Sequence, residues 1–146
     1  AGGTDEATEQ RGAAELQAML TKGDREGACR AAMEHGLWAP ALLLSSYMNL
    51  AAYTQVMAEF TRRTFALGSP LRTIYLLFAG QGKALFDPTE VEAVLDGWQQ
   101  NLAVIVANRT PEDHAVLQLL GDALWQLRGQ VEAAQLCYLL AGVSPE

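Results

Sequence analysis

The chain has 146 residues, of which half are hydrophobic, and its formal net charge is −7 at pH 7. An acidic balance argues against a nucleic-acid partner, and two cysteines are too few for a disulfide framework, which favours a reducing compartment. The longest uninterrupted apolar run, at residues 37–44, is far shorter than the roughly 20 residues that cross a bilayer.

Composition and turn residues predict an all-α chain. The 24 Ala and 22 Leu residues, against 8 Val and 2 Ile, favour helices over sheets. In the first half, turn signals delimit four predicted helices, at residues 6–20, 24–35, 37–48 and 50–67. The polar, Gly-rich residues 1–8 are expected to fray, or to mark a cut inside a longer protein.

A fifth helix is predicted to begin at Pro70, with Ser69 as its N-cap. Its inward stripe is expected to be Leu71, Ile74, Tyr75 and Phe78. Residues 81–97 are predicted to be an irregular linker, in which Asp87–Glu90 matches a capping box that opens a short helix. The helix at 98–107 that follows is expected to turn Trp98 and Leu102, Ile105 and Val106 inward.

The last third of the chain predicts a helical hairpin. Thr110 is the expected N-cap of its first helix, and Gly129 the left-handed residue that ends it. The inward stripe of this helix is Leu117, Leu120, Leu124 and Leu127. The second helix carries a stripe of Val131, Ala134, Tyr138 and Ala141, and its other positions are also apolar, so we expect burial on several sides.

A glycine precedes an alanine by five positions at three predicted turns. The pairs are Gly23 and Ala28, Gly36 and Ala41, and Gly129 and Ala134. Small residues at these turns let helices approach closely, which favours a single α-solenoid segment over residues 1–146; a compact helical bundle is the alternative. Among the tryptophans, Trp38 and Trp98 are expected in the core and Trp125 partly exposed.

The sequence offers little for catalysis, and we predict no catalytic, cofactor-binding or metal site. His35 and His114 have no partner at metal-ligand spacing. Residues 80–83 resemble a phosphate loop superficially, but they lack its first glycine and its Ser/Thr. Cys137 lies in the middle of an apolar helix, where a packing role outweighs that of a nucleophile.

Charge is distributed unevenly along the chain. Residues 87–146 carry nine acidic and two basic side chains, which accounts for the whole net charge. Residues 60–86 contain no acid, and their basic side chains are Arg62, Arg63, Arg72 and Lys83. We name these four residues the basic segment, and they are the candidate residues for binding an acidic partner or an anionic membrane surface. An ordinary solvated face is the favoured interpretation, and docking is the alternative to it.

Four blocks of sequence occur in a fixed order, namely HGLWAPALLLSS at 35–46, ALGSPLRTIYLLFAGQ at 66–81, WQQNLAVIVANRTPED at 98–113 and LGDALWQLRGQVEAAQLCYLLAG at 120–142. Together these blocks resemble the central conserved domain of the Sec-sixteen family, and they are most similar to its green-plant members. The resemblance implies an ancestral coatomer element, which is a folded-back α-solenoid, and a scaffold without catalysis that organises COPII coat assembly at endoplasmic reticulum exit sites. Another coat or nuclear-pore solenoid component is the nearest alternative, and a helical enzyme using Cys137 the more distant one.

The resemblance also implies partners and a location. The partners would be the coat proteins Sec-thirteen, Sec-twenty-three and Sec-thirty-one, the Sar-one GTPase, or a second copy of the chain, with the protein cytoplasmic and peripheral on the endoplasmic reticulum membrane. Family members usually place a β-strand before the solenoid to complete the Sec-thirteen propeller, and residues 1–20 show no strand pattern. Gln135 stands where the family usually has histidine, so no functional residue is carried over.

Overall fold

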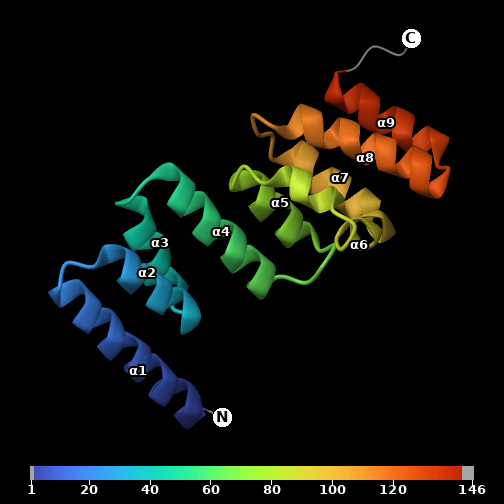
Figure 1. Cartoon of the computed structure of the whole chain (residues 1–146). Helices are drawn as coiled ribbons and strands as arrows, with labels where there is room; N and C mark the ends of the chain where they lie inside the picture. The colour runs from blue at the N-terminus through green and yellow to red at the C-terminus, as the bar shows by residue number, and fades with distance from the viewer. Residues whose placement is uncertain (1, 143–146) are drawn as a thin grey trace. The chain divides into compact units, whose positions relative to one another are not determined.

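A computed structural model describes residues 2–142, with side chains from residue 6 onward, and every regular element in this part of the chain is helical (Figure 1). This confirms the predicted all-α class. The α-helices are α1 (Gly2–Thr21), α2 (Arg25–Glu34), α3 (Trp38–Ser46), α4 (Leu50–Thr64), α5 (Pro70–Phe78), α6 (Val91–Asp96), α7 (Trp98–Ala107), α8 (Asp113–Arg128) and α9 (Val131–Ala141), and the 3-10 helix η1 is Gly82–Phe86.

The chain divides within α4 into two compact units, Ala1–Phe60 and Thr61–Glu146. In the first unit α1 packs on α2, and α2 packs on α3. Its core is a cluster of small side chains, namely Cys29, Ala32, Ala41 and Val56, with larger, partly buried residues around it. Trp38 belongs to that surrounding layer and meets Phe60 edge to face, with ring centroids 5.7 Å apart. Trp38 is thus half-buried, and so is Trp98 at the start of α7 in the second unit. The prediction that both tryptophans are core residues was therefore wrong.

Small residues allow the close helix contacts that the sequence predicts. Ala28, Ala41 and Ala134 are each fully buried. The glycines that precede them, Gly23, Gly36 and Gly129, all have positive φ. Because a left-handed residue reverses the chain with no Cβ in the way, the next helix can return directly against the previous one.

The α8–α9 hairpin packs most closely in the second unit (Figure 1). Gly121 lies under the ring of Tyr138, and a Cβ at Gly121 would be 2.6 Å from Tyr138 Cε1. Tyr138 Oη donates a hydrogen bond of 2.5 Å to Asp122 Oδ1. Burial, and then this bond, raises the pKa of Tyr138 to about 12, so the phenol remains a donor at neutral pH.

Two predicted stripes of this hairpin were wrong in part. Leu117, Leu120 and Leu124 are buried, but Leu127 is exposed. On α9 only one side is covered, because Ala134, Cys137 and Ala141 face α8 while the apolar residues Val131, Leu136 and Leu139 are exposed. Trp125 is about half exposed, as expected.

The stripe predicted for α5 was also wrong. Ile74 is buried, but Leu71 and Phe78 are more than half exposed and Tyr75 is intermediate. The buried face contains the polar residues Arg72 and Thr73 instead.

Thr73 Oγ1 donates to Asn101 Oδ1 at 2.6 Å, and Asn101 Nδ2 lies 3.0–3.1 Å from three carbonyl oxygens. Those oxygens belong to Gly68, Val94 and Gly97, so Asn101 joins α5, α6 and α7.

Several helix starts differ from their predicted positions. The first helix begins at Gly2 and not at Glu6; residue 1 lies outside the described residues, and fraying of residues 1–8 stays a prediction. Ser69 accepts from Arg72 N and caps α5 with Pro70 in its first turn, as expected. Thr110 is not the N-cap of α8, because the helix begins at Asp113 and the Asp113 carboxylate folds back to accept from Thr110 N. The Asp87–Glu90 capping box does not form either, since Glu90 turns to Arg72 and α6 begins at Val91.

Candidate protein-interaction site

The basic segment is split by burial. Arg72 is only 7% exposed, and its Nη2 donates to Glu90 Oε1 at 2.5 Å. Its Nη1 donates to the carbonyl oxygens of Arg62 and Phe65, at 2.9 and 2.8 Å. Arg72 therefore holds the end of α4 against α5 and cannot be part of a docking surface, which corrects that element of the sequence prediction.

The other three residues of the basic segment, Arg62, Arg63 and Lys83, are exposed. Arg62 and Arg63 lie in the last turn of α4, where the helix dipole favours cations, and Lys83 lies in η1. Glu90 neutralises the buried Arg72, so three of the four basic side chains of the segment lie at the surface. The exposed remainder is the part of the predicted site that is accessible to a partner.

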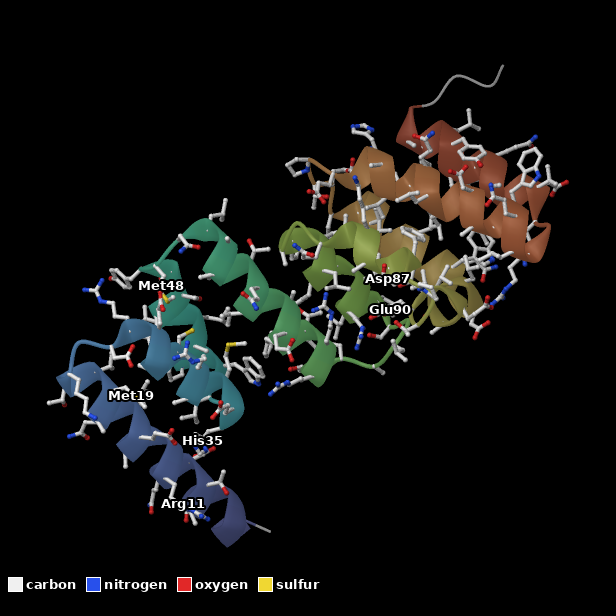
Figure 2. All side chains as sticks on the ribbon, in the orientation of Figure 1. Arg11, Met19, His35, Met48, Asp87 and Glu90 are labelled. Atoms are coloured by element: carbon white, nitrogen blue, oxygen red, sulfur yellow. The ribbon has the colours of Figure 1, made fainter. Side chains whose placement is uncertain are left out.

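Glu90, labelled in Figure 2, is the partner that sequence reasoning missed. The sequence showed no acid in residues 60–86, but Glu90 lies 18 positions beyond Arg72 and is only 5% exposed. A buried arginine needs a partner of opposite charge, and so does a buried glutamate, because neither charge is stable alone in an apolar interior.

Both histidines have hydrogen-bonding partners within the fold. His35, also labelled in Figure 2, lies 2.7 Å from Glu15 Oε2 through its Nε2. His114 Nδ1 lies 2.9 Å from Ala141 O at the end of α9. Within residues 6–142, no group of three or more His, Cys, Asp or Glu side chains could hold a metal ion. Among the described helices none combines the length and the apolar character needed to cross a bilayer.

Cys137 is expected to react slowly in the folded chain. It is fully buried, and this burial raises the pKa of its thiol to about 11 from an ordinary value of 9.0. Since the thiolate is the reactive species, two pKa units imply about a hundredfold less of it at neutral pH than in the unfolded chain. A Cys29→Ala variant isolates Cys137, and its modification by a disulfide reagent should accelerate at least that much in urea. Rapid modification without denaturant would instead indicate a reactive nucleophile.

A family model described as "Sec16 Sec23-binding domain" matches residues 16–146. The chain is 39% identical over 129 residues to the "Protein transport protein SEC16A homolog" of Arabidopsis thaliana. This alignment covers 88% of the chain and 10% of that relative. The chain is 36% identical over 149 residues to the SEC16B homolog of the same plant, covering 88% of the chain and 11% of the relative. A fungal "COPII coat assembly protein sec16", from Aspergillus terreus, is 32% identical over 152 residues, covering 86% and 8%.

The chain thus spans about a tenth of the length of these relatives. The two plant relatives are more similar to it than the Aspergillus protein is. No solved structure matches the chain.

Proposed function

The chain belongs to the Sec-sixteen (Sec16) family, and from this premise we propose that it is a non-catalytic scaffold segment for COPII coat assembly at endoplasmic reticulum exit sites. The observation that carries the proposal is the family match over residues 16–146, together with relatives that are named for protein transport and COPII coat assembly. The burial of Cys137 and the structural roles of both histidines support a scaffold over an enzyme.

The partner with the most direct support is Sec-twenty-three, because the matching family model is described as binding it. We also propose that the chain contacts other coat components, namely Sec-thirteen, Sec-thirty-one, the Sar-one GTPase or a second copy of itself. We place the protein in the cytoplasm, held at the membrane peripherally through its coat partners.

A single α-solenoid over residues 1–146 is the architecture we propose for this role. The left-handed glycines at the turns before α2, α3 and α9, and the buried alanines in the first part of each of these helices, support it, because together they let each helix return closely against its predecessor. Repeating helical pairs expose a long surface relative to their volume, and such a surface suits a protein that binds several partners.

The test is charge reversal in the exposed part of the basic segment. An Arg62→Glu, Arg63→Glu variant is expected to bind purified Sec-twenty-three more weakly and to show a smaller salt dependence of binding, because two cations that attract acidic groups are replaced by repelling ones. Its unfolding free energy should change by no more than about 1 kcal/mol, as is usual for exposed charges.

The matched control reverses two exposed arginines of α2, in an Arg25→Glu, Arg30→Glu variant with the same total charge. Equal weakening in both variants would show that only net charge matters and would remove the basic segment from the proposal. If the unchanged chain does not bind Sec-twenty-three at all, the proposed partner is wrong.

A further inference from the structure

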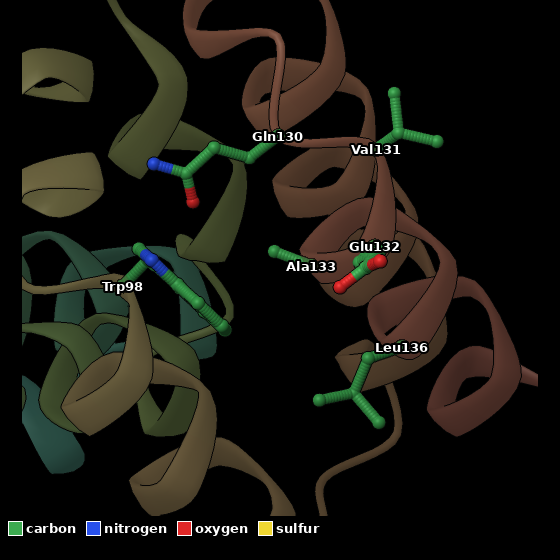
Figure 3. A pocket seen from close by; sticks show the side chains of 6 residues that line it. All are labelled: Trp98, Gln130, Val131, Glu132, Ala133 and Leu136. Atoms are coloured by element: carbon green, nitrogen blue, oxygen red, sulfur yellow. The ribbon is translucent and has the colours of Figure 1, made fainter.

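An apolar groove lies between the start of α7 and the start of α9, and none of the residues that line it belongs to the basic segment. It has a volume of about 530 Å³ and is lined by Trp98, Gln130, Val131, Glu132, Ala133 and Leu136. In Figure 3 the side chains of Gln130, Ala133 and Leu136 extend toward Trp98 from the opposite wall. The groove is open to solvent, and its volume falls in the usual range of about 300–1,000 Å³ for ligand-binding clefts.

The groove walls present apolar surface that the fold leaves uncovered. Trp98 is half-buried, so part of its indole is accessible, and Leu136 is 43% exposed. A large aromatic ring beside an exposed leucine is typical of the anchor points that dominate protein interfaces. Apolar side chains are therefore one part of the chemistry that would fill this groove.

The charge around the groove indicates the second chemical feature of a partner that would fill it. Glu132 is the single charged side chain among the six that line the groove, and it is exposed. The guanidinium of Arg128, at the end of α8, is already bound by Glu92 Oε2 at 2.8 Å and by Asp96 Oδ1 at 3.0 Å. Two carboxylates against this one cation leave the vicinity of Trp98 acidic, in the half of the chain that carries the whole net charge.

An accessible indole and a carboxylate that line the same groove can together recognise a cation, because the ring face and the carboxylate both attract positive charge. We propose that this groove binds a short segment of a partner protein in which an arginine or lysine lies next to an apolar side chain. The apolar side chain packs against Leu136 and Ala133, and the cation lies between Trp98 and Glu132. This goes beyond the proposed scaffold function, because it assigns a second, oppositely charged surface to the chain.

The experiment measures binding of a fluorescein-labelled peptide of alternating leucine and arginine to the whole chain by fluorescence anisotropy. A peptide with glutamate in place of arginine is the reference and should bind at least tenfold more weakly. Leu136→Ser should weaken binding of the arginine peptide about tenfold, because one anchor contact is lost. Glu132→Gln should weaken it about threefold, as expected for an exposed ion pair.

Matched controls come from the same surface. Leu139→Ser changes an equally apolar and more exposed residue of α9 that does not line the groove, and it should leave the affinity unchanged. The Arg62→Glu, Arg63→Glu variant should also bind the peptide normally, so failure of this inference and failure of the proposed function are distinguishable. Equal binding by the Leu136→Ser and Leu139→Ser variants overturns the inference. The inference is also overturned if the chain binds neither peptide and sediments as a dimer that the Leu136→Ser variant does not form, because the groove would then bind a second copy of the chain.

Discussion

Replacing Arg72 with methionine is expected to lower the unfolding free energy by about 3–5 kcal/mol, the usual cost of breaking a buried ion pair from one side. The change leaves the Glu90 carboxylate buried without its cation. It also removes the donors to the carbonyl oxygens of Arg62 and Phe65 at the end of α4. Urea unfolding followed by circular dichroism measures the loss.

A double-mutant cycle separates the two contributions of Arg72. Glu90→Leu alone should also be strongly destabilising, because it strands the buried guanidinium. The double variant should lose less than the sum of the single changes, and the remaining loss should reflect the two orphaned carbonyls. Additive losses would mean that Arg72 and Glu90 do not interact energetically, and a loss below about 1 kcal/mol for Arg72→Met would contradict its burial.

Gly68→Ala is expected to destabilise the chain by about 2–5 kcal/mol, combining left-handed strain with overpacking. Gly68 has a φ of 76°, and a Cβ there would collide with the Ala93 carbonyl oxygen and lie 2.8 Å from the Ala93 side chain. The neighbour is backbone of α6, so it cannot rotate away as a flexible side chain could. The thermal midpoint of unfolding should fall accordingly.

Gly80→Ala is the matched control for this change. Gly80 has a similar φ of 72°, but the nearest atom to its Cβ would be Glu112 Oε1 at 3.8 Å. This variant should therefore lose only the strain, about 1–2 kcal/mol. If both variants melt at the same temperature, the close contact between the residue 66–69 turn and α6 is not present in solution.

The sequence by itself determined the helical class, most helix ends and the family. These features depend on short-range chemistry, since Ser69 caps the helix that begins one residue later and Gly129 ends α8 at a position where only glycine is unstrained. The four ordered blocks identified the family for the same reason, because each block is a run of consecutive residues.

Tertiary structure decided which residues face inward. On α5 the 3.6-residue period allowed more than one face to point inward. The positions of Glu90 and Asn101 decided that the buried face is the one that contains Arg72 and Thr73. On α9 one stripe packs on α8, and no sequence pattern said that the other would remain exposed. A buried polar residue needs partners that lie 18 or 28 positions away along the chain, and periodicity contains no information about such distant positions. For that reason Arg72 was wrongly included among the candidate partner-binding residues. The sequence shows four cations in the basic segment, and only the fold shows that Arg72 is buried and bound to Glu90.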